Sequence, residues 1–257
     1  MPPKRRRTHA RPAAALRPPA ISVPRSLMPN RLLAALPLAD YARISRSLQT
    51  VPLILKDVLQ RPGDPIYDVY FPGGGFCSIL TVLKDRSMVE IATVGREGMV
   101  GISAVLDRGL PNSSLTMVQA ASDTCYRMPI EAFRREMDKR GRFAALVSRY
   151  ANAYIGFVMQ STACNAKHSV EQRLARWLLL AQDRVGRVEF SLTQEFVAMM
   201  LGASRPTVTV VAGALQQAKL ITYHRGIVRI LNRVKLEAVS CECYRVTTEL
   251  LSEVMHE

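Results

Sequence analysis

The hydrophobic pattern changes character along the chain. Between about Thr50 and Met128, short apolar runs alternate with turn-forming residues, a spacing typical of the strands of a barrel or sandwich. The runs are VPLIL, YDVYF, CSILTVL, VEIATV, LTMVQAA and TCYRM, separated by breaks such as RPGDP, PGGG and GREG. The upstream segments NRLLAAL and DYARISRSL instead have helical spacing. The pattern therefore predicts a β-sheet domain that follows a short helical entry.

A long amphipathic helix is predicted after these strands. The strand pattern stops at Pro129, Ile130–Met137 has the pattern of a short helix, and Phe143 to about Lys167 that of a long one. Burial against the chain's own barrel or against the same helix of a second copy would both hide its apolar stripe. We favour the second copy because the stripe is long. The predicted dimerisation residues are Phe143, Val147, Tyr150, Tyr154, Phe157, Val158 and Ser161.

The segment 169–235 has the element order of a winged helix-turn-helix. An apolar helix face around Trp177 is followed by VGRVEFSLT, which resembles a short strand pair. Thr193 can cap a helix that ends at Gly202. Ser204 can cap the next helix, where Pro206 is tolerated in the first turn although the following TVTVV is rich in β-branched residues. A hairpin is predicted over 220–231, with its turn at His224-Arg225-Gly226.

The helix after Ser204 has two different sides. Its inward side carries Val208, Val211, Ala212 and Leu215, and its other side is basic and polar without an acidic residue. In helix-turn-helix proteins the N-terminal residues of this second helix face the base edges. An arginine there can pair with guanine, hydroxyls and free N–H groups suit phosphate, and methyl groups can contact thymine. The predicted DNA-binding residues are Thr193, Ser204, Arg205, Pro206, Thr207, Thr209, Val210 and Arg225.

Charge supports a polyanionic partner. The net charge is +14, and residues 1–26 carry seven basic residues and no acidic one. This Pro- and Arg-rich stretch is predicted to be a disordered basic tail. Positive charge is also concentrated between Glu171 and Lys235, where the helix-turn-helix is predicted.

Other function classes find little support. No run of about 18 apolar residues predicts a membrane span, and no apolar h-region predicts a secretory signal, so a cytoplasmic protein is expected. The catalytic motifs G-x-S-x-G, H-E-x-x-H and the P-loop are missing from the sequence, and its four histidines are scattered. The chain is therefore not expected to be an enzyme or to carry a cofactor.

The cysteines predict no metal site. Five of them lie at 77, 125, 164, 241 and 243, and this odd, sparse set fits a reducing compartment. Cys241 and Cys243 are closer than in the usual C-x2-C pair and have no second pair. Cys164 lies near the end of the long helix, where oxidation could move one domain against the other, but a buried thiol is the favoured interpretation.

These segments resemble a known family. VEQRLARWLL, LTQEFVAMMLGASRPTVT and LITYHRGIVRILN are similar to the C-terminal domain of bacterial regulators of the cyclic-AMP receptor protein/fumarate-nitrate regulator (Crp/Fnr) superfamily, and YFPGGGFCSIL and VEIATVGREGMVGISAVL to its β-roll. The resemblance implies an α+β fold with a cyclic-nucleotide-binding-type β-roll. The expected parts are a tail (1–26), a β-roll sensor (27–142), a dimerisation helix (143–168), a winged helix-turn-helix (169–235) and a helical extension (236–257).

The resemblance also implies partners, and the sequence departs from it in two places. It implies a homodimer on a pseudo-palindromic DNA site, with RNA polymerase as a further partner. The position after the recognition arginine is often Glu in the family, but here it is Pro206, so the usual target sequence does not transfer. The nucleotide-binding turn reads Gly98-Met99-Val100-Gly101 without its acid, and 111–115 lacks the arginine, Arg108 being out of register. The effector is therefore not expected to be cyclic AMP. A cyclic-nucleotide-dependent sensor and a thiol-redox-responsive regulator remain the alternatives.

Overall fold

The computed structural model describes residues 23–106 and 111–255, and it confirms the α+β fold class. Most of the predicted basic tail and Arg108 lie outside these residues. The described end of that tail is ordered, because Arg25 belongs to a short 3-10 turn, η1 (Arg25–Leu27), and donates a hydrogen bond to the Ala34 carbonyl at 3.0 Å. The helices α1 (Arg31–Ala34) and α2 (Leu38–Ser45) follow.

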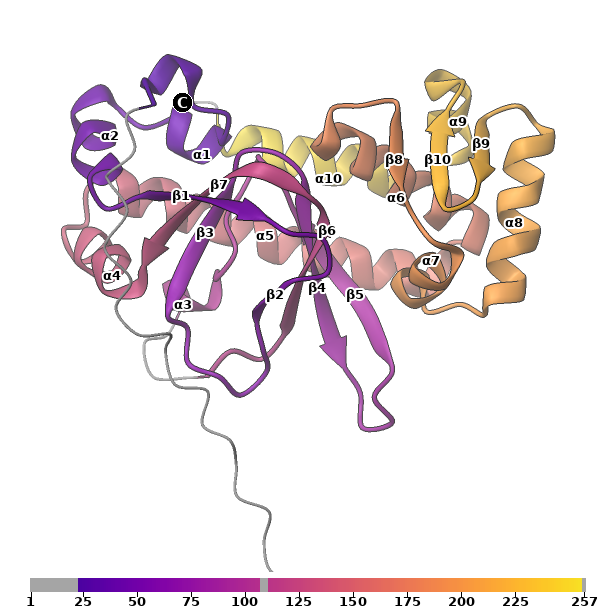
Figure 1. Ribbon diagram of the computed structural model, residues 1–257, viewed down its shortest axis with the longest axis horizontal. Helices are drawn as coiled ribbons and strands as arrows, with labels where there is room; N and C mark the ends of the chain where they lie inside the picture. Colours follow the sequence, from indigo (N-terminus) through magenta and orange to yellow (C-terminus); the bar gives the residue numbers. More distant parts are fainter. Residues whose placement is uncertain (1–22, 107–110, 256–257) are drawn as a thin grey trace, which may run out of the picture.

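Two antiparallel sheets build the β-roll (Figure 1). One has the strand order β1-β7-β3 and the other β2-β6-β4-β5. Phe71 and Val118 belong to different sheets and are both fully buried in one hydrophobic core. The strands are β1 (Gln49–Leu53), β2 (Val58–Gln60), β3 (Asp68–Pro72), β4 (Phe76–Val82), β5 (Met88–Val94), β6 (Leu115–Ala120) and β7 (Ser122–Pro129). All of these strands except the three-residue β2 overlap the predicted apolar runs.

Three helices accompany the roll. The short α3 (Ser103–Leu106) follows β5, and α4 (Ile130–Asp138) leaves β7 directly. The 26-residue α5 (Arg142–Lys167) then runs behind the roll towards the second domain (Figure 1). It ends at His168, whose extended backbone turns the chain into the next helix.

The second domain is a winged helix-turn-helix followed by two helices. Its elements are α6 (Val170–Val185), β8 (Glu189–Ser191), α7 (Gln194–Leu201), α8 (Arg205–Gln217), β9 (Ile221–His224), β10 (Ile227–Ile230), α9 (Arg233–Val239) and α10 (Cys243–Glu253). The predicted strand pair over VGRVEFSLT is wrong. Only β8 forms there, because α6 continues to Val185, Gly186 ends it in the left-handed conformation, and β8 pairs with the later strand β10.

The two domains share an interface rather than only a linker. The Trp177 ring of α6 packs edge-on against Phe76 of β4 at 6.0 Å, and its Nε1 donates to Glu90 of β5 at 2.8 Å. Arg184 forms a buried ion pair with Glu97 at 2.8 Å. Burial raises the pKa of Glu90 to about 7, an effect that the hydrogen bonds from Ser78 and Trp177 only partly offset. A carboxyl that titrates near neutrality therefore lies between the sensor and the helix-turn-helix.

Candidate nucleic-acid interface

The turn between α7 and α8 is fixed by local capping. The Thr193 hydroxyl accepts a hydrogen bond from the Phe196 N–H at 3.2 Å, and Gly202 ends α7 with φ +56°. The Ser204 hydroxyl then accepts from the Thr207 N–H at 3.2 Å. These three predicted signals are confirmed. The helices meet at 106°, an angle typical of helix-turn-helix motifs.

Within the described residues, no single helix is long and apolar enough to cross a membrane. The bent pair α7–α8 passes that test of length and composition only when its two helices are taken together.

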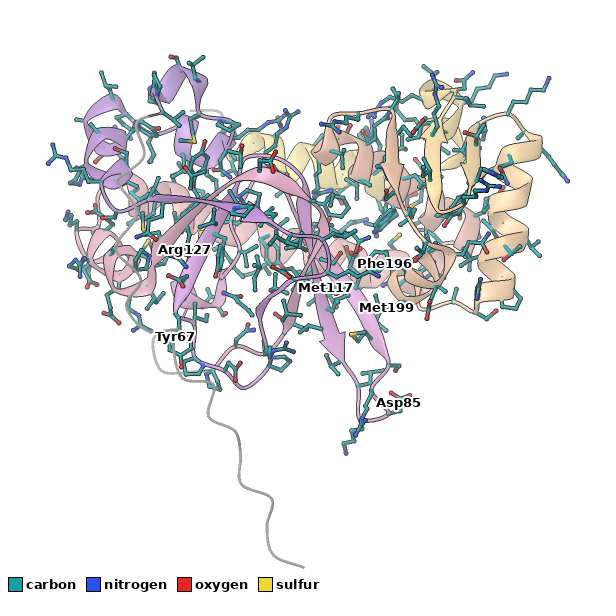
Figure 2. All side chains as sticks on the ribbon, in the orientation of Figure 1. Tyr67, Asp85, Met117, Arg127, Phe196 and Met199 are labelled. Carbon is teal, nitrogen blue, oxygen red and sulfur yellow. The ribbon has the colours of Figure 1, made fainter. Side chains whose placement is uncertain are left out.

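Burial of one side of α8 sets which side faces solvent. Val208, Ala212 and Leu215 are fully buried in the cluster that also holds Trp177 and Met200. The predicted β-branched run is therefore helical, because packing of its inward residues outweighs a weak intrinsic strand preference. Phe196 and Met199 of α7 pack against the same cluster as Met117 of the β-roll (Figure 2). The inward side of the helix-turn-helix thus packs against α6 and the β-roll, and the opposite face of α8 is exposed to solvent.

The open face of α8 is polar and carries one arginine, Arg205. Arg205 forms no ion pair with any residue that the structure describes, and Val210 is 73% exposed. The Ser204 and Thr207 hydroxyls lie 2.7 Å apart at the start of α8. The Thr209 hydroxyl lies 3.0 Å from both the Arg205 carbonyl and Gln194 Oε1 of α7. The exposed predicted residues of this face are Ser204, Arg205, Pro206, Thr207, Thr209 and Val210.

The wing presents the last predicted contact. The strands β9 and β10 are joined by Arg225 and Gly226, which both have positive φ, +48° and +77°. Such a two-residue turn matches the twist of a hairpin, and it places the Arg225 side chain in solvent at the tip. A cation at this tip suits a DNA backbone phosphate.

The predicted dimerisation stripe faces inward, which corrects the sequence prediction. Phe143, Val147, Tyr150, Tyr154 and Phe157 are all buried in the core of the chain's own β-roll. Ser161 is also buried, and Val158 packs partly buried against that core. The stripe therefore packs against the chain's own β-roll, the alternative to packing against a second copy.

Sequence reasoning missed a second stripe on α5. Ile155 and Met159 are 45% and 68% exposed, although both are large and apolar. They belong to a row of exposed residues with alternating spacings of three and four, which is the spacing of a coiled-coil seam. This exposed α5 stripe consists of Ala145, Ser148, Asn152, Ile155, Met159, Thr162 and Ala166. Its small and polar members concealed it from a search for apolar periodicity.

A small cavity lies inside the part of the β-roll that the structure describes. Its volume is about 30 Å³, and it lies between Gln60, Gly101, Asn112, Ser114 and Tyr154. The segments that the family uses for a cyclic nucleotide therefore do meet in space. Ligand pockets typically measure some 300–1,000 Å³, so this cavity does not accommodate a nucleotide. Tyr154 links the cavity wall to α5.

Cys164 is part of a group rather than an isolated thiol. Its Sγ lies 3.5 Å from Cys241 Sγ, and both are buried. The hydrogen bond to Cys241, together with burial, raises the pKa of Cys164 above its ordinary value. The same hydrogen bond lowers the pKa of Cys241 to about 5. A redox role for Cys164 stays a prediction.

Comparisons with known proteins agree with this architecture. Residues 172–239 match the family described as a Crp-like helix-turn-helix domain. The chain is 24% identical over 187 residues to the global nitrogen regulator of Synechococcus elongatus, covering 68% of this chain and 82% of that protein. The global nitrogen regulator of a Nostoc species is 23% identical over the same shares.

Solved structures show the same fold. A transcriptional regulator of the Crp/Fnr family from Eubacterium rectale has a TM-score of 0.59 at 20% identity, covering 81% of this chain and 96% of that chain. A Crp-family regulator from Thermus thermophilus has a TM-score of 0.58 at 18% identity, covering 74% and 95%.

A β-roll joined by one long helix to a winged helix-turn-helix is the architecture that this chain shares with these Crp/Fnr-type structures. The chain has the fold of the Crp/Fnr superfamily, and its second domain is a Crp-like helix-turn-helix domain.

Proposed function

We propose that the protein is a sequence-specific DNA-binding transcription regulator. The observation that carries this proposal is the open first turn of α8, where Arg205 has no acidic partner among the described residues. Its guanidinium can make two hydrogen bonds to guanine in the major groove. The Ser204 and Thr207 hydroxyls would hold one phosphate, and Arg225 would hold another from the wing.

The target sequence would differ from that of relatives with an acidic residue after the arginine. Pro206 has no side-chain acceptor for cytosine, so base reading would depend on Arg205 and on methyl contacts from Thr209 and Val210. Enrichment of genomic fragments on the purified protein tests this function. We expect a recurrent pseudo-palindrome whose affinity falls steeply with salt. Equal affinity for all duplexes would refute sequence-specific regulation.

We further propose that the protein is a homodimer joined through the exposed α5 stripe. Two such helices packed side by side would bury Ile155 and Met159, the large apolar residues that the monomer leaves in solvent. A two-fold axis along this seam would present two copies of α8 to half-sites about one helical turn apart. The dimer would work in the cytoplasm with DNA, and RNA polymerase is the further partner that the family implies.

The dimer seam can be tested apart from DNA recognition. The double change Ile155→Asp and Met159→Asp places charges in the seam, so sedimentation should show a monomer with much weaker affinity for a full site. The control Val234→Asp alters an equally apolar residue on α9 that is 78% exposed and lies off the seam. A dimer that survives the double change would refute this seam, while leaving the α8 interface in place.

Cyclic AMP is not the proposed effector, because the cavity of about 30 Å³ is too small for a nucleotide. A contact from the cavity to α5 through Tyr154 gives a route by which a smaller effector would act on the long helix.

A further inference from the structure

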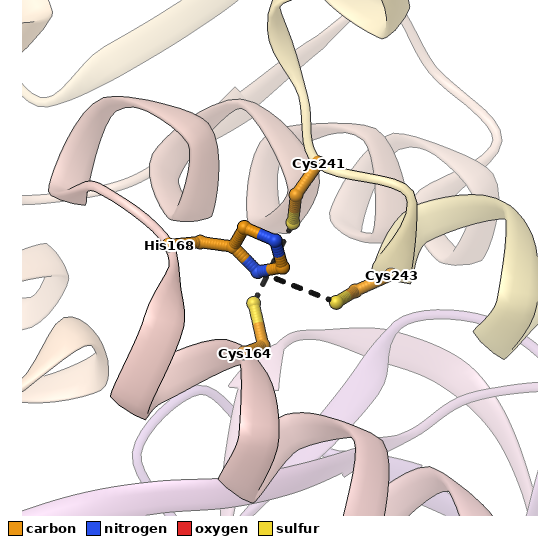
Figure 3. A group of neighbouring side chains, drawn as sticks. All are labelled: Cys164, His168, Cys241 and Cys243. Carbon is orange, nitrogen blue, oxygen red and sulfur yellow. Dashed lines mark hydrogen bonds between the residues drawn. The ribbon is translucent and has the colours of Figure 1, made fainter.

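Four potential metal ligands converge where α5 ends (Figure 3). Cys164 lies in the last turn of α5 and His168 directly follows that helix. Cys241 and Cys243 come from the link between α9 and the start of α10. One ligand atom from each residue lies within 4.8 Å of all the others. Two sequence pairs, C-x3-H and C-x-C, therefore meet at one point although 72 residues separate them.

The spacing of these atoms suits a single tetrahedral ion. The Cys164 and Cys241 Sγ atoms are 3.5 Å apart, and Cys243 Sγ is 3.5 Å from His168 Nδ1. A tetrahedron with a Zn–S bond of about 2.3 Å has edges of roughly 3.8 Å. The four atoms thus lie close to ligand spacing, whereas a multi-iron cluster would need its cysteines spread around several metal atoms.

The surroundings favour ligation over three ordinary buried thiols. Buried cysteines usually pack as small hydrophobes, but these three form a cluster of their own, apart from both hydrophobic cores. His168 Nε2 lies 3.2 Å from the Glu242 carboxylate. A carboxylate at one ring nitrogen is the usual partner of a metal-bound histidine and leaves the other nitrogen, Nδ1, free to coordinate.

The local charge also fits. Three thiolates and one neutral imidazole around a divalent cation carry a net charge of −1. The buried Arg176 acts electrostatically on Cys164, and its Nε and Nη1 have no hydrogen-bond partner among the described residues. Gln160 Nε2 in addition donates to Cys243 Sγ at 3.0 Å. The site therefore has a compensating cation and a sulfur-directed donor.

We propose that Cys164, His168, Cys241 and Cys243 bind one Zn²⁺ ion in a closed, structural site. Three sulfurs and one nitrogen in a tetrahedron are a ligand set that zinc prefers, and four protein ligands leave no open position for catalysis. On binding, the three thiols release their protons to solvent. The ion would fix the hinge between α5 and α6 to the C-terminal helix α10, and so set how the helix-turn-helix is held against the long helix.

Metal analysis of the purified full-length chain tests the proposal. We expect about one zinc per chain, lost in Cys241→Ser and Cys243→Ser and retained in Cys125→Ser, which alters a buried cysteine in the β-roll. Replacement of zinc by Co²⁺ should give the visible absorption of a tetrahedral thiolate complex. A chain without zinc whose cluster cysteines are fully reactive, a Cys164–Cys241 disulfide, or bound iron would each overturn it.

A milder variant keeps the test valid if the cysteine variants do not fold. Glu242 is largely exposed, so Glu242→Gln should leave the fold intact while lowering zinc affinity roughly 10-fold or more, measured by competition with a chromophoric chelator. Glu249→Gln, on the exposed side of α10, should leave the affinity unchanged. Equal affinities in both variants and wild type would contradict the role given to His168.

Discussion

Glu90 at the domain interface gives a prediction whose size follows from the structure. Its pKa of about 7 exceeds the ordinary value of 4.5, so the folded protein binds this proton more tightly than the unfolded chain does. Stability that is present below about pH 4.5 is therefore lost as the pH rises to about 7. Glu90→Gln removes the buried charge and keeps an oxygen that can accept from Trp177 Nε1.

The expected gain comes from that difference in pKa. At 1.36 kcal/mol per pH unit the upper limit is roughly 3 kcal/mol, and since Glu90 is only partly buried we expect roughly 1–2 kcal/mol at pH 8. The variant should melt a few degrees higher than wild type at pH 8, and most of this advantage should vanish at pH 5. Thermal unfolding at the two pH values measures it.

Trp177 provides a direct reading of the same group. It is the only tryptophan in the sequence and touches the Glu90 carboxyl, so its fluorescence should change with a midpoint near pH 7 in wild type and not in Glu90→Gln. The control Glu249→Gln alters an exposed carboxylate and should match wild type. A stability gain that is the same at pH 5 and pH 8, or a fluorescence change that survives in Glu90→Gln, would refute the reasoning.

Three further outcomes are expected for the β-roll, the α8 cap and the cavity. Gly75→Ala should lower the free energy of unfolding more than Gly186→Ala does. Both glycines have positive φ, so each change should cost roughly 1–2 kcal/mol, but a Cβ at Gly75 would also lie 2.2 Å from the Ala120 carbonyl oxygen. Equal losses in the two variants would contradict this close packing. Ser204→Ala should cost roughly 0.5–2 kcal/mol because α8 loses its N-cap, and an unchanged melting temperature would refute that cap. Saturating cyclic AMP should leave the melting temperature unchanged, whereas binding at 100 times its Kd would stabilise by about 2.7 kcal/mol and would contradict the small cavity.

Local signals made the helix-turn-helix predictable from sequence. Thr193, Gly202 and Ser204 act within a few residues of their own positions, and the structure has each of them at the predicted helix end. The strands of the β-roll were predictable for the same reason, except β2, which lies outside the predicted apolar runs. Caps and short-range periodicity suffice where neighbours in sequence are also neighbours in space.

Long-range contacts were not predictable in this way. Two stripes on α5 have helical spacing, and only the position of the β-roll shows that the one with Tyr150 faces inward and the one with Met159 outward. Cys241 and Cys243 lacked a visible second pair because Cys164 and His168 lie far away in sequence. The C-x3-H spacing at the end of the predicted long helix, considered together with C-x-C, is the sequence signal that could have indicated the proposed metal site.

In the proposed function, Arg205 reads the DNA sequence from the open face of α8. This role is tested most directly by the ratio of affinities for the selected palindrome and a scrambled duplex, measured by fluorescence anisotropy at fixed salt. We predict that Arg205→Ala lowers the affinity for the palindrome by roughly 5- to 150-fold per half-site, the equivalent of 1–3 kcal/mol, and hardly alters binding to the scrambled duplex. Arg61→Ala, which removes the same charge from an exposed loop of the β-roll, should keep the wild-type ratio. An unchanged ratio in Arg205→Ala would contradict the account.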